Sequence, residues 1–225
     1  MQVNMLALRD MVPLDLVGPY EVLTRVPGWT VELVAVDMKP VVTDKGLALL
    51  PNRTRETAKP ADLLVVPGGA GADIAMLDAD WVAFVRAQAA GAKYVFGICT
   101  GALLLGAAGL LAGKRAGAHW QARDLLAQFG AIPSDERIVV DGNIYTSAGV
   151  TSGIDAALRV VADLAGEDRA RMIQLGMEYD PAPPFDGGTP FTSPREIVDG
   201  VLAAAAPRRA KREAQVAEAA ARMKR

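Results

Sequence analysis

The run from Gly97 to Gly101 limits the possible folds of this chain more than any other stretch, because it places the single cysteine between two glycines. Residues 93–96 before it form an apolar run typical of a buried strand, and residues 102–108 after it are typical of a buried helix. A reactive side chain with glycine two residues to either side, at a strand-to-helix junction, has the spacing of a nucleophile elbow. Glycine is required where a turn is too tight for a neighbouring β-carbon. We therefore expect a sharp turn that displays Cys99.

Two interpretations of Cys99 are open. A lone cysteine in apolar surroundings is usually a small buried hydrophobe. The helix that begins after Cys99 would instead direct its backbone N–H groups and the positive end of its dipole toward the sulfur, which favours the thiolate over the thiol. The flanking glycines and the strand-to-helix junction favour the second interpretation, in which Cys99 is a nucleophile.

The composition limits the class of protein. The chain has 225 residues, of which 51% are hydrophobic and 5% aromatic, which suits one large α/β domain with extensions. Its net charge of −2 favours neither nucleic acid nor an anionic membrane as a partner. One cysteine cannot form an internal disulfide, and residues 1–8 lack the features of a signal peptide. A membrane span needs about 18 consecutive apolar residues, and no apolar run in the chain is that long. We therefore expect a cytoplasmic protein.

Strand and helix patterns alternate along most of the chain. Strands are predicted at residues 3–8, 30–36, 63–66, 93–96 and, more weakly, 114–118, with hairpins at 41–50 and around Asp141-Gly142. Helices are predicted to begin at Asp15 and to cover residues 80–90, 102–108, 119–129, 154–165 and 168–177. This alternation with short loops implies a mostly parallel sheet covered by helices on both faces. The functional site of such a sheet lies beyond the carboxyl ends of its strands.

The composition changes after residue 178. Residues 179–194 are rich in proline and glycine and form an extended arm, after which a helix is predicted from Pro194 to about residue 206. Pro207 should interrupt this helix, and residues 208–225 are a candidate for a separate basic helix, most simply a solvated face or an assembly element. We expect a catalytic domain at residues 1–178 and an extension, not a second domain, at residues 179–225.

Gly68 and Gly69 follow the strand predicted at residues 63–66. One interpretation of this pair is a tight turn. In the other interpretation the backbone N–H groups of Gly69 and Thr100 form an anion hole beside Cys99, where one such donor contributes about 3 kcal/mol to transition-state stabilisation. The pair is not a nucleotide-binding loop, because it lacks the required glycine spacing and a Lys-Ser/Thr pair.

Two further titratable residues are candidates for the site. Asp15 opens a predicted helix, so that it is either an N-cap or a general acid beside Cys99. Burial and the neighbouring thiolate would raise the pKa of Asp15 and keep it protonated. His119 is the single histidine, and a pocket-lining or structural role is expected for it. No group of residues has metal-ligand spacing, so we expect neither metal nor organic cofactor.

With these residues in place, the chain resembles the ThiJ/PfpI superfamily, which is related to the class I glutamine amidotransferases. The resemblance covers residues 1–176 and implies a flavodoxin-like three-layer sandwich and, by analogy, a homodimer. Its motifs resemble the branch that contains the isonitrile hydratases and the sensor domains of AraC-type regulators. The segments that carry the motifs are residues 15–23, 65–69, 97–102 and 146–150. Residues 174–185 are similar to the tail of the isonitrile hydratases.

The resemblance implies addition of water to a small apolar isonitrile, which gives an N-substituted formamide. Cys99 would attack the isonitrile carbon, Asp15 would transfer the proton, and Thr100 would position water or orient Asp15. Gly68, Gly69, Thr100 and His119 would then line an apolar pocket with few polar groups.

The sequence departs from the family pattern in two places, and two other functions stay open. Thr100 follows the cysteine where protease-like members have histidine, which makes a peptidase improbable. Gly117 and Ala118 stand where many relatives have two threonines, which makes the substrate preference less secure. The alternatives are a glyoxalase or redox-stress protein and a ligand sensor. Glyoxalase-type relatives usually have Glu in place of Asp15, and a DNA-binding regulator would need a further domain after Pro207.

Overall fold

The computed structural model describes residues 1–223, and its centre is a seven-stranded sheet in the order β10-β11-β7-β6-β1-β2-β5. All neighbouring strands are parallel except β10, which pairs antiparallel with β11. The strands are β1 (Gln2–Leu6), β2 (Thr30–Ala35), β5 (Arg53–Thr54), β6 (Leu63–Val66), β7 (Tyr94–Ile98), β10 (Ile138–Asp141) and β11 (Ile144–Ser147). The mostly parallel sheet that the alternating pattern predicted is confirmed.

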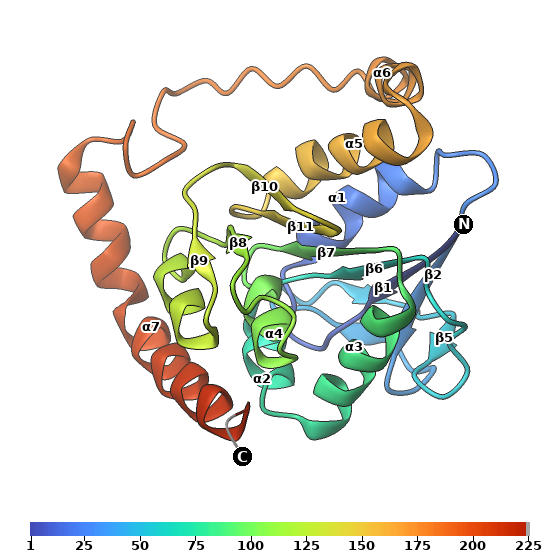
Figure 1. Cartoon of the computed structure of the whole chain (residues 1–225). Coiled ribbons are helices and arrows are strands. Elements are labelled where there is room, and N and C mark those ends of the chain that lie inside the picture. Colours follow the sequence, from blue (N-terminus) through green and yellow to red (C-terminus); the bar gives the residue numbers. More distant parts are fainter. Residues whose placement is uncertain (224–225) are drawn as a thin grey trace.

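Helices cover both faces of this sheet (Figure 1). One layer contains α1 (Pro13–Leu23), α5 (Ser152–Ala165) and α6 (Glu167–Gly176). The opposite layer contains α2 (Ala70–Ala75), α3 (Ala79–Gly91) and α4 (Gly101–Ala107). The expected three-layer α/β sandwich is therefore present, and in the described residues 1–223 none of the helices is long and apolar enough to cross a membrane.

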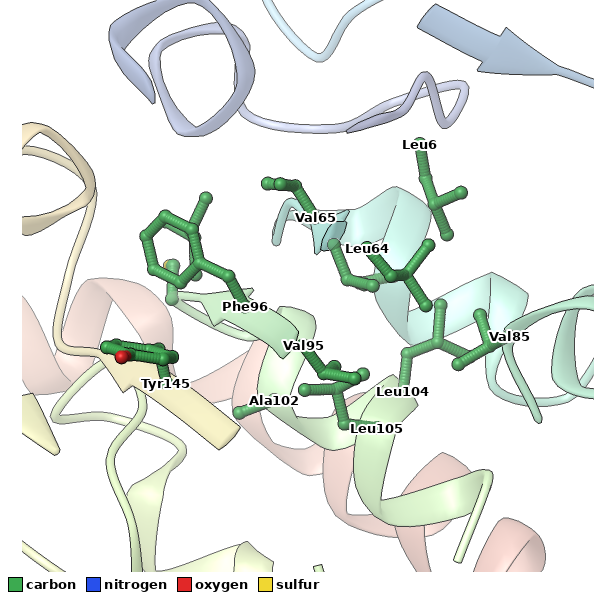
Figure 2. Packing of buried hydrophobic residues seen from close by; sticks show 14 of the residues in the cluster. Leu6, Leu64, Val65, Val85, Val95, Phe96, Ala102, Leu104, Leu105 and Tyr145 are labelled. Atoms are coloured by element: carbon green, nitrogen blue, oxygen red, sulfur yellow. The ribbon is translucent and has the colours of Figure 1, made fainter. Parts of the chain in front are cut away.

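The core lies where the central strands meet α4. All four residues of β6 and all seven of α4 are buried, as expected for elements packed on both sides. Figure 2 shows Leu104 and Leu105 of α4 beside Val95 of β7, with Val85 of α3 next to Leu104. Burial of such large aliphatic side chains contributes about 1.5–3 kcal/mol each to folding. The strand-to-helix junction at Cys99 is therefore held between two well-packed elements.

Three short elements were not predicted, and two predicted hairpins are confirmed. The hairpins are β3 (Val41–Val42) with β4 (Ala48–Leu49), and β10 with β11. The elements that were missed are β5, β9 (Ile132–Pro133) and α2; β9 pairs with the weakly predicted β8 (Arg115–Ala116). Strands of two residues and a helix of six are too short to show a period in the sequence.

The helix predicted over residues 119–129 is wrong in its first turn and in its type. A 3-10 helix, η1 (Arg123–Phe129), takes its place, and residues 119–122 form a turn. The backbone N–H of Gln121 donates to Nδ1 of His119 at 3.3 Å instead of entering a helix. A side chain that captures a local backbone N–H in this way competes with helix formation.

The C-terminal helix α7 (Arg195–Met223) is continuous, whereas Pro207 was expected to interrupt it. Four consecutive alanines, at residues 203–206, precede Pro207 and favour the helix strongly. Beyond Pro207 the helix is held against the core through Val216 and its buried neighbours, where it contacts α2, α4 and η1. The helix was expected to reach residue 225, and the last two residues lie outside the described part of the chain.

Candidate functional site

The turn after β7 is a strained elbow with Cys99 at its tip. Cys99 has a φ of 55°, a value that side-chain-bearing residues rarely adopt. A β-carbon on Gly101 would lie 2.2 Å from the carbonyl oxygen of Val66, and one on Gly97 would lie 2.7 Å from Cδ1 of Leu105. Gly101 is therefore required for the close approach of the β6 backbone, whereas a β-carbon on Gly97 would displace the end of the Leu105 side chain.

The carboxyl ends of three neighbouring strands bring the candidate residues together. The loop after β1 leads to Asp15, the turn after β6 contains Gly68, and Cys99 directly follows β7. The N–H of Gly68 donates to Oδ2 of Asp15 at 3.0 Å. A β-carbon on Gly68 would lie 2.5 Å from the backbone nitrogen of Thr100 and 2.8 Å from Oδ2 of Asp15. Glycine at this position thus allows the carboxyl group to approach the elbow.

Asp15 is not the N-cap of its helix. The helix begins at Pro13, Val12 is the capping residue without a side-chain bond, and Asp15 is in the first turn. The side chain of Asp15 is fully buried, and its Oδ1 atom has no hydrogen-bond partner among the described nitrogen and oxygen atoms. A buried carboxyl oxygen without such a partner has a cost in free energy and is typical of a group with a chemical role.

Asp15 and Cys99 form one coupled acid pair. Burial, opposed by the hydrogen bonds from Gly68 and Cys99, raises the pKa of Asp15 to about 7. Burial and the charge of Asp15 raise the pKa of the Cys99 thiol, although the backbone N–H groups of Thr100 and Val150 face the sulfur and lower it. The backbone N–H at the helix N-terminus favours the thiolate, as expected, but burial has the larger effect and the net pKa of Cys99 is raised. Above about pH 7 the pair holds one proton.

The anion hole predicted from Gly69 and Thr100 is only partly available. The N–H of Gly69 donates to Oγ1 of Thr100 at 2.8 Å, so the side chain of Thr100 already occupies that donor. The backbone N–H of Thr100 faces Cys99, and it is joined there by the N–H of Val150, which sequence reasoning missed. Thr100 therefore fixes the turn after β6 against the elbow, in addition to supplying a backbone donor.

A small cavity opens over the sulfur. It has a volume of about 120 Å³ and is lined by Val12, Gly69, Cys99, Thr100, His119, Gln121, Val150, Arg208 and Arg212. Pockets that hold drug-sized ligands have volumes of about 300–1,000 Å³. The smaller volume of this cavity indicates a small ligand. A second cavity of about 280 Å³ shares His119 and Val150 with it and is lined on its outer side by arm residues 188–191.

His119 lines this cavity as a neutral donor. Burial and the charges of Arg212 and Arg208 lower the pKa of His119 to about 4. Its Nδ1 atom accepts the N–H of Gln121, so the ring proton is on Nε2. His119 borders the cavity, but it does not lie at a helix start, because the 3-10 helix begins at Arg123.

Two arginines of α7 were not predicted as part of the site. Arg212 is 4% exposed, and it pairs with Asp73 of α2 through Nε to Oδ1 at 2.9 Å and Nη2 to Oδ2 at 2.8 Å. Arg208, one turn earlier on α7, is exposed and lines the same cavity. The spacing of four residues puts both arginines on one helix face, but no sequence signal shows that this face returns to Cys99. The expectation of an apolar pocket with few polar groups is therefore wrong.

This arrangement is suited to covalent chemistry on a small electrophile. A nucleophile and an acid–base group lie together beyond the strand ends, with backbone donors beside the sulfur. Within residues 1–223 no group of three or more His, Cys, Asp or Glu side chains is placed to hold a metal ion.

Comparison with known proteins places these features in a family. Residues 1–163 match the model of the DJ-1/PfpI family. The chain is 48% identical to isonitrile hydratase of Pseudomonas putida over 207 residues, which is 92% of this chain and 91% of that protein. It is 29% identical to the transcriptional regulator GbdR of Pseudomonas aeruginosa, strain UCBPP-PA14, over 65% of this chain but only 40% of the regulator.

A solved structure of similar architecture supports the same assignment. The crystal structure of a ThiJ/PfpI family protein from Pseudomonas syringae superposes with a TM-score of 0.93 and 41% identity, over 96% of this chain and 90% of that one. The match includes most of the chain beyond the family model. The chain belongs to the DJ-1/PfpI family.

Proposed function

We propose that this chain is an isonitrile hydratase, which adds water to R–N≡C and releases the formamide R–NH–CHO. The observation that carries the proposal is the 48% identity, over 92% of the chain, to the isonitrile hydratase of Pseudomonas putida. The site supports it, because the buried Cys99–Asp15 pair supplies what an isonitrile carbon requires: a soft nucleophile and a proton.

In the first step the pair adds H–S across the isonitrile carbon. Sγ of Cys99 forms a bond to the terminal carbon, and the proton held by the pair goes to the same carbon, which gives the thioimidate R–N=CH–S. One proton is enough for this step, and above about pH 7 the pair holds one. Asp15 is left as a carboxylate beside the covalent intermediate.

In the second step Asp15 acts as the base. It takes a proton from water as the oxygen attacks the thioimidate carbon, and that proton goes to the nitrogen. The remaining hydroxyl proton returns through Asp15 to the sulfur as the C–S bond breaks, so that the formamide leaves and the pair regains its proton. The N–H groups of Thr100 and Val150, which face the sulfur, are the donors that would stabilise the departing thiolate.

The burial of Cys99 favours this function over a redox sensor. Redox-sensing cysteines are exposed and have low pKa values. Cys99 is 4% exposed, and burial raises the pKa of its thiol. A sensor function is supported less, since the chain covers only 40% of the regulator that it resembles.

The proposal is tested by formamide production from cyclohexyl isocyanide. Wild type should release N-cyclohexylformamide, and Cys99→Ala should lose at least about three orders of magnitude in kcat/KM, because both steps pass through the sulfur. Asp15→Asn should lose a similar factor in kcat/KM. A thioimidate that forms on Cys99 in this variant should stay bound, because the base that activates water is missing. Full activity of Cys99→Ala would refute the covalent route, and an inactive wild type would refute the function.

A further inference from the structure

The wall of the Cys99 cavity opposite the elbow is cationic, although the proposed substrate class requires no charge. Arg208 and Arg212 of α7 line the cavity together with His119 and Gln121. Asp73 balances the charge of buried Arg212, so the unmatched charge on this wall is that of Arg208. The side chains on this wall therefore point to a ligand that has a matching charge.

Arg212, which lines the cavity, has bonding capacity left over. Its Nε and Nη2 atoms bind both oxygens of Asp73, while Nη1 has no hydrogen-bond partner among the described residues. The bridge to Asp73 is buried, with about one-twentieth of each side chain exposed, so the guanidinium is fixed in orientation. Arginine presents its donors in a rigid fork that suits a carboxylate, and the free edge of Arg212 is such a donor.

Arg208 is the charged group at the cavity mouth. It is exposed yet lines the cavity, and no carboxylate lies within ion-pair distance of it among residues 1–223. Its neighbour Arg209, by contrast, pairs with Asp124 and Glu213. The charge of Arg208 reaches the site, since it lowers the pKa of both Asp15 and His119. Arg208 is therefore an unpaired cation that faces the reaction centre.

The geometry of the substrate class places any charged substituent on this wall. The C–N–C atoms of an isonitrile are collinear, so that a substituent points directly away from the carbon that Cys99 attacks. With the carbon at the sulfur, the far end of a short substituent meets the other side chains that line the cavity, among which Arg208 is exposed and positively charged. The cavity over the sulfur has a volume of about 120 Å³, so even a short substituent reaches the side chains that line it. The neutral Nε2–H of His119 is a further donor on this route.

We propose that the substrate is a small isonitrile that carries a carboxylate, and that Arg208, with the free edge of Arg212, binds the carboxylate and sets this specificity. The inference rests on the proposed hydratase function, because it assigns the substituent of that substrate. The reaction is unchanged: the carboxylate takes no part in the bonds that form and break at the isonitrile carbon.

The experiment compares isocyanoacetate with its methyl ester, which differs in charge but has the same isonitrile carbon. For each substrate, formamide production is measured with wild type, Arg208→Gln and Lys211→Gln. Lys211 is the matched control, because it lies exposed on the same helix and does not line the cavity. Arg208 is exposed, so its replacement should not disturb folding, and an unchanged urea midpoint verifies this.

Wild type should hydrate isocyanoacetate with a kcat/KM about tenfold or more above that for the ester, as expected for one charge-assisted hydrogen-bonded pair. Arg208→Gln should remove this preference, mainly through KM, so that the acid and the ester are hydrated with about equal kcat/KM, while Lys211→Gln keeps the wild-type preference for the acid. Equal losses on both substrates in Arg208→Gln, or a wild-type preference for the ester, would overturn the inference while leaving the hydratase function intact. If wild type hydrates neither substrate nor cyclohexyl isocyanide, the proposed function itself fails.

Discussion

The buried carboxyl group of Asp15 should make the stability of this protein depend on pH in an unusual direction. Its pKa is raised from 3.8 to about 7, because burial penalises the charged form. Between these two values the folded chain holds a proton that the unfolded chain has released, so the free energy of unfolding falls as the pH rises. Each pKa unit corresponds to about 1.4 kcal/mol, which makes the full effect about 4 kcal/mol.

Replacing Asp15 by asparagine should isolate this effect. The amide oxygen can still accept the N–H of Gly68, and the side chain keeps its size but has no charge at any pH. From pH 5 to pH 8 wild type should lose about 3 kcal/mol through Asp15 alone, corresponding to about two units of titration below its folded pKa. The free energy of unfolding of Asp15→Asn relative to wild type should therefore rise by the same amount.

Urea denaturation of both proteins at pH 5 and pH 8 provides the measurement. All other titrating groups are common to the two proteins and cancel in the difference, and the Cys99 thiol stays protonated in the fold because its pKa is raised. Asp186→Asn, in the exposed arm, is the control, because it removes a carboxylate that is not buried. A difference that changes by less than about 1 kcal/mol for Asp15→Asn, or that falls with pH, would refute the assignment of a raised pKa to Asp15.

Three other predictions follow from the same contacts. The logarithm of kcat/KM of wild type should rise with unit slope up to about pH 7 and level off above it, because Asp15 becomes a base there. His119, with a pKa of about 4, should add no further limb between pH 5 and 8. A stopped assay over this range decides, and a rate that falls through pH 7 would contradict the coupled pair. Gly101→Ala should lower the urea midpoint strongly, because its β-carbon would meet the Val66 carbonyl at 2.2 Å, whereas a stable, active variant would contradict the elbow packing. Asp73→Asn should lower the free energy of unfolding by about 3 kcal/mol, because it leaves the Arg212 guanidinium without its counter-charge. The control is Asp124→Asn, which removes an exposed partner of Arg209 and should have a much smaller effect. Equally small effects of the two substitutions on urea denaturation would show that the buried bridge is unimportant.

The sequence was sufficient for the elbow because its requirements are local. The glycines at positions 97 and 101 indicate that there is little space around their own backbone. The apolar runs beside them indicate that β7 and α4 are buried. The parallel sheet then follows from the alternation of strands and helices, and it places Asp15, Gly68 and Cys99 at neighbouring strand ends. These features could be predicted without any knowledge of contacts.

The electrostatics of the site could not be predicted in the same way. The helix dipole at Cys99 is visible in the sequence, but the burial that outweighs it depends on elements that arrive from distant parts of the chain. The same holds for the N–H of Gly69, which is bonded to the side chain of Thr100, 31 residues away. Single residue types show which groups are present, and only the packing shows which of them are already paired.

The C-terminal helix was the largest error, and its cause is physical. The sequence of α7 shows a basic, alanine-rich helix, but its docking depends on the Asp73–Arg212 bridge between residues 139 positions apart. The arm at residues 179–194 contains neither helix nor strand, so no local pattern shows where α7 is directed. Three arginines hold it: Arg209 to Asp124, Arg212 to Asp73, and Arg222 to the carbonyl of Leu77.

The position of α7 separates two tasks within the proposed enzyme. The elbow, Asp15 and the Gly68 turn lie within the family-matched residues 1–163, whereas Arg208 and Arg212 lie on a helix outside that match. In this proposal the reaction chemistry lies on residues 1–163 and the selection for substrate charge lies on α7. The two parts are joined by the proline- and glycine-rich arm at residues 179–194. A change on the cavity-facing side of α7 should alter which isonitriles bind without altering the nucleophile. By the same reasoning, the Asp73–Arg212 bridge connects the two parts, because it fixes α7 to α2 beside the turn that contacts Asp15.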